Sequence, residues 1–256
     1  MIPKIIHYCW FGRNPLPELA QKCIASWKKY LPDYEIKEWN EDNFDVNIIP
    51  YTAEAYAAKK YAFVSDYARF WILYKYGGIY FDTDVEVIRP FNDIINNGNF
   101  MGFEVDPDGE NSPDKYAPWF SFCVNPGLGI GMEKNHPFME EMLNFYANLH
   151  FGNRKLDPWL ETIVAYTTKC LVKNGLQNKS GIQKVGNITI YPHTYFAPIN
   201  VISKRLHITP QTYSIHQYMG SWNNMKKSWK EIIGYYIPEW MFFLNNKIKR
   251  RKYRRK

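Results

Sequence analysis

Two aspartates separated by one residue, Asp82 and Asp84, directly follow a short apolar segment at 79–81. Side chains alternate along an extended chain, so both carboxylates fall on one face. Two hard oxygen ligands at the end of a strand suit a divalent cation, and such a cation can hold a nucleotide diphosphate. The alternative interpretation is a solvated surface turn, because isolated Asp-x-Asp pairs are common.

The segment before this pair has the pattern of a helix that ends in a glycine pair, Gly77-Gly78. Glycines that accept positive φ are typical of such an end. Asp66 and Arg69 are three residues apart, so they lie on one side of this helix. Two interpretations are open: the residues form a plain ion pair, or they present a carboxylate and a guanidinium to a sugar. The apolar stripe of the helix comprises Ala62, Phe63, Tyr67, Phe70, Trp71 and Tyr74.

The run from Ser65 to Asp84 has the pattern Ser-Asp-x-x-Arg-x-x-x-Leu-x-x-x-Gly-Gly-x-Tyr-x-Asp-x-Asp. It resembles the sugar-binding region of glycosyltransferase family 32 and, more distantly, the glucosyltransferase domains of the large clostridial toxins. Segments 2–12 and 216–222 fit the same family in the expected order. The resemblance is strong to about residue 105 and thin from there to His216. It implies an α/β fold of the GT-A type, a Rossmann-like sheet flanked by helices that binds a nucleotide sugar, and retaining transfer.

The resemblance also implies roles for particular side chains. Asp84 and His216 would bind the metal, and Asp82 would bridge the metal and the ribose or sugar. Asp66 and Arg69 would hold donor sugar hydroxyls, so the catalytic set comprises these two residues with Asp82 and Asp84. An imidazole ligand favours Mn²⁺ over Mg²⁺, although a lone histidine is more often structural.

Further nucleotide-sugar contacts are expected from Trp10, Tyr80, Ser221 and Trp222. Trp10 ends the first strand at the edge where open α/β sheets bind nucleotides, and would stack on the donor base. The alternative is an ordinary core tryptophan. Ser221 and Trp222 would lie on a loop over the diphosphate, with Gly220 as its hinge.

The acceptor side is less defined in the sequence. Asn125, Asp157 and Glu161 are weaker candidates, and the Gly-Pro pair common in the middle of family members is missing. His7 is expected to be a packed structural histidine.

Composition indicates one globular unit. The 256 residues are 46% hydrophobic and 18% aromatic, which excludes disorder. Eight of the 32 basic residues lie in 247–256, so the rest carries 24 basic against 25 acidic residues and is not a basic nucleic-acid surface. The widely spaced cysteines suggest neither zinc nor redox chemistry.

The expected domains are a GT-A domain at 1–226 and an amphipathic basic tail at 227–256. The tail is expected to bind an anionic membrane surface, the alternative being a helix packed on the domain. Without a signal peptide or spanning segment, we expect a cytoplasmic protein, peripheral on the cytoplasmic face of the membrane.

Periodicity predicts strands at 2–10, 34–39, 79–81, 85–88, 120–124, 128–132, 188–191 and 212–215. It predicts helices at 17–30, 53–76, 136–149 and 158–173, and a surface loop at 106–118. The segment at 85–88 is expected to continue the strand at 79–81.

The sequence therefore predicts a metal-dependent hexosyltransferase that uses Mn²⁺ or Mg²⁺. Its donor would be a UDP-sugar and its acceptor a glycan, lipid-linked, in capsule or O-antigen type polysaccharide synthesis. The alternatives are a metal-dependent phosphohydrolase and a non-catalytic carbohydrate- or membrane-binding module.

Overall fold

The computed structural model describes residues 1–107, 122–153, 162–200 and 203–220. Within these residues, eight strands form the main sheet in the order β2-β1-β3-β7-β5-β9-β8, with β6 beside β5. These strands are β1 (Ile5–Cys9), β2 (Glu35–Trp39), β3 (Gly78–Tyr80), β5 (Asn99–Val105), β6 (Cys123–Val124), β7 (Ile130–Met132), β8 (Gln183–Val185) and β9 (Ile188–Tyr191). The separate pair β4 (Val85–Val87) and β10 (Ser214–His216) is antiparallel.

Five strands of the main sheet run in one direction. β1 is parallel to β2 and β3, and β5 is parallel to β9. β7 runs antiparallel to both β3 and β5, so β3 and β5 point the same way. The carboxyl ends of β1, β3, β5 and β9 therefore meet at one edge, where open α/β sheets bind ligands.

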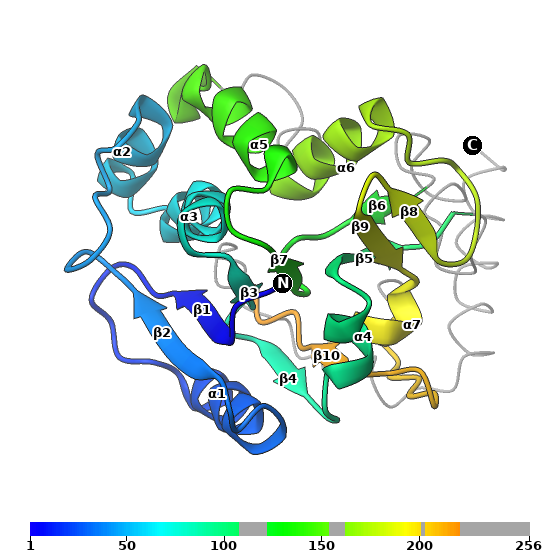
Figure 1. The fold of residues 1–256 in the computed structure, drawn as a ribbon. Helices are drawn as coiled ribbons and strands as arrows, with labels where there is room; N and C mark the ends of the chain where they lie inside the picture. Colours follow the sequence, from blue (N-terminus) through cyan, green and yellow to red (C-terminus); the bar gives the residue numbers. More distant parts are fainter. Residues whose placement is uncertain (108–121, 154–161, 201–202, 221–256) are drawn as a thin grey trace, which may run out of the picture.

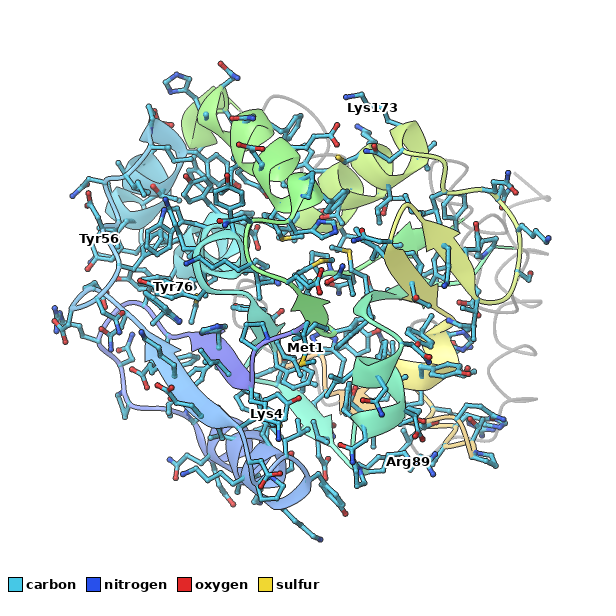
Figure 2. The ribbon with its side chains drawn as sticks, in the orientation of Figure 1. Met1, Lys4, Tyr56, Tyr76, Arg89 and Lys173 are labelled. Carbon is cyan, nitrogen blue, oxygen red and sulfur yellow. The ribbon has the colours of Figure 1, made fainter. Side chains whose placement is uncertain are left out.

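Helices cover both faces of this sheet (Figure 1). On one face lie α2 (Pro50–Ala57), α3 (Tyr61–Tyr76), α5 (Pro137–Ala147) and α6 (Ile163–Lys173), and on the other α1 (Glu18–Tyr30), α4 (Asn92–Asn96) and α7 (His193–Phe196) with the β4–β10 pair. A short 3-10 helix covers Phe151–Asn153. Side chains fill both layers between sheet and helices (Figure 2), and two apolar clusters form the core. The predicted GT-A arrangement, a Rossmann-like sheet flanked by helices, is confirmed.

Two expected elements differ from the structure. The helix expected at 53–76 is two helices, because the chain turns at Ala58–Lys60 and Lys59 adopts a φ of 56°. The segment expected to continue β3 leaves the main sheet as β4 and pairs with β10. The link between β3 and β4 carries Asp82 and Asp84, so these carboxylates lie between the two sheets.

Several elements were not anticipated: β5, β8, α4 and α7. The expected loop at 106–118 and the start of the expected helix at 158–173 lie largely outside the described residues, as does the tail at 227–256. No helix in the described part of the chain has both the length and the apolar character that crossing a membrane requires.

The turn from α3 into β3 depends on glycine. Gly78 has a φ of 104°, and a Cβ there would come within 2.6 Å of the Ile5 carbonyl oxygen. A side chain would therefore push β3 away from β1. This close approach sets the position of β3, whose end leads directly to the aspartate pair.

His7 of β1 joins this turn to β2. Its buried imidazole contacts the Gly77 carbonyl oxygen through Nε2 at 2.9 Å, and Trp39 Nε1–H donates to its Nδ1 at 3.1 Å. Burial lowers the pKa of His7 to about 4, although the bond to Gly77 acts in the opposite direction. The imidazole is therefore neutral at physiological pH and structural, as expected.

We predict an acid-dependent loss of stability that depends on His7. Between pH 6.5 and about 4 the unfolded chain binds a proton at this residue that the folded chain does not. Stability should be full above pH 6.5 and fall towards pH 4, by up to about 3 kcal/mol from this group. Urea unfolding of the wild type and His7→Gln at pH 7 and pH 4.5 measures this.

The His7→Gln variant should be less stable at pH 7 but lose less stability on acidification. Equal losses in the two proteins would contradict the assignment of the proton to His7.

Candidate functional site

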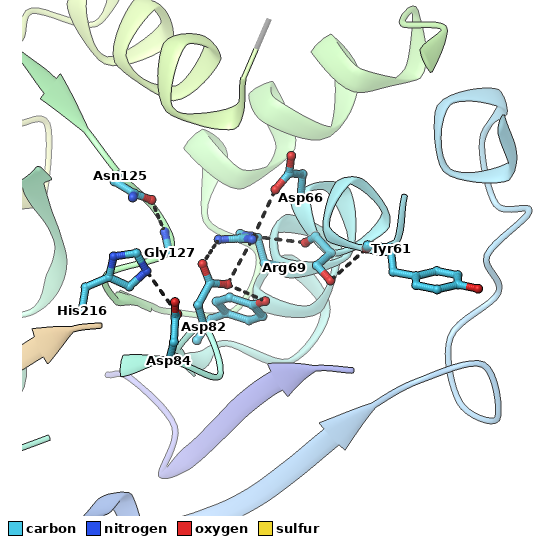
Figure 3. Close-up of polar contacts among 10 residues, drawn as sticks. Tyr61, Asp66, Arg69, Asp82, Asp84, Asn125, Gly127 and His216 are labelled. Carbon is cyan, nitrogen blue, oxygen red and sulfur yellow. Dashed lines mark hydrogen bonds and ion pairs between the residues drawn. The ribbon is translucent and has the colours of Figure 1, made fainter. Parts of the chain in front are cut away.

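The link between β3 and β4 brings Asp84 against β10 (Figure 3). The Asp84 carboxylate is buried, and its Oδ1 lies 3.1 Å from His216 Nε2. The backbone N–H of Met219 donates to its other oxygen at 2.8 Å. Burial disfavours the charged carboxylate, but His216 and these hydrogen bonds outweigh it and lower the pKa of Asp84 to about 2.

His216 is the last residue of β10 and pairs in register with Val85, next to Asp84. Burial favours its neutral form, yet the nearby charges of Asp84 and Asp82 raise the pKa of the imidazole to about 9. Its Nδ1 is buried and has no hydrogen-bond partner in the described part of the chain. The strand pairing therefore holds an imidazole, with one nitrogen unsatisfied, beside two carboxylates.

Asp82 faces a buried guanidinium. Arg69 Nη2 lies 3.2 Å from Asp82 Oδ1, and Tyr80 Oη donates to the same oxygen at 3.2 Å. The Asp82 side chain remains 30% exposed. Burial raises its pKa, while Arg69 acts in the opposite direction. Asp82 is thus the member of the pair that solvent can reach.

Arg69 is fixed from several directions on α3. Its Nη2 lies 3.3 Å from Asp66 Oδ1, its Nε–H donates to the Ser65 carbonyl oxygen, and its Cζ lies 4.7 Å from the centre of the Tyr80 ring. The ion pair that the spacing allowed is present. It also contacts Asp82, which links Asp66 and Arg69 to the carboxylate pair and gives them a place at the site.

Gly127 was not singled out in the sequence, although it lies against the site. A Cβ on this residue would come 2.1 Å from Asp82 Oδ2, and its carbonyl oxygen accepts from the Asp82 backbone N–H at 3.2 Å. Its own N–H donates to Asn125 Oδ1 at 2.7 Å. Asn125, a weaker candidate, therefore lies close to Asp82, and the absence of a side chain at Gly127 allows the Asp82 carboxylate to take its position.

Ligand atoms of Asp82, Asp84 and His216 all lie within 4.8 Å of one another, an arrangement able to hold a metal ion. The donor set of two carboxylates and an imidazole suits Mn²⁺, and His216 turns Nε2, the nitrogen 3.1 Å from Asp84 Oδ1, towards the carboxylates.

Trp10 follows β1 at the predicted carboxyl edge. It is partly exposed, and its Nε1–H donates to the Asn14 carbonyl oxygen at 2.6 Å. Part of the ring packs against the apolar cluster beneath it, so the side chain is neither fully core nor free. Tyr80 is buried beside Arg69. Ser221, Trp222, Asp157 and Glu161 lie outside the described residues.

Comparison with known proteins agrees with this geometry. Residues 17–101 match the model for the glycosyltransferase sugar-binding region containing the DXD motif. An uncharacterized glycosyltransferase of Acanthamoeba polyphaga mimivirus is 34% identical over 230 residues, which cover 87% of this chain and 84% of that protein.

Two further similarities are more partial. Inositol phosphoceramide mannosyltransferase 3 of Schizosaccharomyces pombe is 29% identical over 59% of this chain, and the match spans 40% of that relative's length. Among solved structures, the PaToxG glycosyltransferase aligns with a TM-score of 0.49 and 21% identity, over 67% of this chain and 69% of that one.

The match to the family model and the similarity to the viral relative together show the family. The chain belongs to the glycosyltransferases whose sugar-binding region contains the DXD motif, the group that family 32 typifies.

Proposed function

We propose that this glycosyltransferase moves a hexose from a nucleotide diphosphate sugar to a glycan acceptor, with Asp82, Asp84 and His216 as ligands of Mn²⁺ or Mg²⁺. The observation that carries the proposal is the convergence of these three side chains at the carboxyl edge, beside the Asp66–Arg69 pair. When bound, the metal would supply positive charge for the departing diphosphate.

Each side chain of the site has a separate task in this proposal. Asp84 is held by His216 and the Met219 N–H, so it is oriented before any ligand arrives. Asp82 is oriented by Arg69 and Tyr80 and is exposed enough to meet the donor. Asp66 and Arg69 would bind donor sugar hydroxyls, because a buried carboxylate and guanidinium offer acceptors and donors in fixed directions.

Stereochemical retention is part of the proposal and rests on the family resemblance. In it, the leaving phosphate takes the proton of the acceptor hydroxyl while the new glycosidic bond forms on the same face of the sugar. The site then needs to orient both substrates and exclude water, which the rigid side chains around Asp82 support.

The substrates are proposed from two sources. The sequence favoured a UDP-sugar, while the Schizosaccharomyces pombe relative is named as a mannosyltransferase, so a donor panel must include UDP-hexoses and GDP-mannose. That relative's name also includes inositol phosphoceramide. The lipid-linked acceptor of this proposal comes from the sequence. The assignment to capsule or O-antigen type synthesis, and to the cytoplasmic face of the membrane, rests on the sequence alone.

Replacing Asp84 by Asn should reduce donor turnover by about 10²–10³-fold, the usual effect of removing one electrostatic contact to a transition state. The amide can still accept the Met219 N–H, and His216 can lose its proton once the neighbouring charge is gone, so the fold should persist. Release of nucleotide from the donor panel, with Mn²⁺, Mg²⁺ or EDTA, measures turnover, and far-UV circular dichroism checks folding.

The matched control is Asp42→Asn, which removes an exposed carboxylate paired with Arg13. It should leave turnover unchanged. Full activity of Asp84→Asn, or activity in EDTA equal to that with metal, would refute the metal site, and donor turnover to free sugar alone with every acceptor would favour a hydrolase.

Substitutions of Trp10 and His216 should both weaken nucleotide binding, but with a different dependence on the metal. Trp10→Ala should weaken binding of the free nucleotide by about 1–3 kcal/mol, as expected for loss of base stacking. His216→Ala should weaken binding mainly when metal is present, since its proposed role is coordination. Calorimetric titrations with nucleotide, with and without Mn²⁺, separate the two; equal effects under both conditions would remove the metal role of His216.

The basic tail at 227–256 is proposed to bind an anionic membrane surface. Deleting residues 247–256 should release the protein from vesicles containing phosphatidylserine, because each basic residue near such a surface contributes about 1 kcal/mol. Added salt should have the same effect as the deletion. Vesicle sedimentation of the full-length and the truncated chain tests this. Identical partitioning of the two would exclude an electrostatic anchor. Donor turnover by the truncated chain serves as the control for folding.

A further inference from the structure

A second pair of side chains lies at the same edge of the sheet, outside the metal group. Asp106 directly follows β5, and His193 begins α7 just after β9. Because β5 and β9 are parallel neighbours and β5 points the same way as β3, both residues lie at the edge that carries Asp82. The Asp106–His193 pair is thus on the ligand-binding side of the sheet.

The geometry of this pair exceeds what a helix cap requires. Asp106 Oδ1 accepts from the His193 backbone N–H at 2.7 Å, which alone caps the short helix. Its second oxygen lies 2.7 Å from His193 Nδ1. A carboxylate at Nδ1 holds the proton there and leaves Nε2 as a hydrogen-bond acceptor.

The imidazole of His193 is accessible to a ligand. Its side chain is 20% exposed, and that of Asp106 is 15% exposed. No residue in the described ranges makes a hydrogen bond to its Nε2. The pair therefore offers one oriented acceptor atom, in a partly buried position.

Two further polar side chains, Glu104 of β5 and Cys123 of β6, lie at the same end of the sheet as this pair. Glu104 is the penultimate residue of β5, and Asp106 directly follows that strand. Glu104 Oε2 lies 4.0 Å from Cys123 Sγ.

We propose that His193 binds a hydroxyl group of the acceptor sugar through Nε2, and that Asp106 is the positioning residue that fixes this imidazole. The inference rests on the proposed glycosyl transfer and assigns its acceptor side. A polyhydroxylated sugar is the ligand class that suits it, because an imidazole nitrogen held in a fixed direction beside a carboxylate matches hydroxyl groups. The leaving phosphate remains the group that takes the proton, so His193 orients the hydroxyl and does not ionise it.

The test separates acceptor binding from donor chemistry. The probes are the donor selected by the panel, whose slow transfer to water needs no acceptor, and methyl α-D-mannopyranoside as a minimal acceptor. His193→Asn keeps an amide near the position of Nδ1, to bond Asp106, but removes Nε2. It should leave metal-dependent donor hydrolysis at the wild-type rate and raise KM for the mannoside by about tenfold, the loss expected for one hydrogen bond.

Three further variants sharpen the result. His193→Gln reaches the position of Nε2 and should recover part of the affinity, whereas Asp106→Asn should raise KM less than His193→Asn. His150→Asn is the matched control, because His150 forms a similar pair with Glu54 at 2.6 Å on another part of the molecule. It should change nothing.

The outcomes distinguish this inference from the proposed function. A wild type that turns over no donor refutes the proposed function, and this assignment with it. Given donor turnover, an unchanged KM in His193→Asn, or equal losses of hydrolysis and transfer, overturns the assignment alone. If the mannoside yields no product, ¹⁵N spectra of the imidazoles decide: a shift of the His193 signal on adding it, without one at buried His136, supports the assignment, and no shift overturns it.

Discussion

The contact between Asp84 and His216 is the interaction on which the site depends. It joins the link after β3 to the end of β10, two segments far apart in the sequence. Two buried groups of opposite charge stabilise each other there, and each would be costly to bury alone. A metal ion bound at this place would take the position of the Nε2 proton of His216, because an imidazole coordinates a metal through a deprotonated nitrogen.

The remaining site is arranged around this contact in two tiers. Asp82, two positions before Asp84, turns the other way, towards Arg69 and the backbone of Gly127. Asp66 also pairs with Arg69, so the guanidinium is shared between two carboxylates. The chain thus separates a deeply held carboxylate, suited to a cation, from an accessible one, suited to a substrate.

Much of this could be predicted from local sequence because its signals are local. The aspartate pair, the Asp66–Arg69 spacing and the glycine turn lie within one continuous segment, and the first strand-helix-strand unit shows clear periodicity. The separation of β4 from β3 could not be read in the same way. Alternation does not reveal which partner a short strand chooses, and only pairing with β10 brings His216 into register with Val85.

Other features escaped prediction for different physical reasons. β5 is buried along nearly its whole length, so it lacks the alternation that marks a half-exposed strand. Gly127 matters because of the atom it lacks, which a sequence shows only once its neighbour is known. Asp106 and His193 meet through the parallel pairing of β5 with β9, a long-range contact with no local signature.

The pairing of β4 with β10 also has a consequence for biosynthesis. The ribosome synthesises Asp84 long before His216. During that time the Asp84 carboxylate, which is buried in the folded protein, lacks the imidazole with which it pairs. The first strands and α3 can assemble early, but the region after β3 must wait for the strand that closes it. During translation the cluster of Asp82, Asp84 and His216 is therefore one of the last parts of the described structure to form, after most of the main sheet is in place.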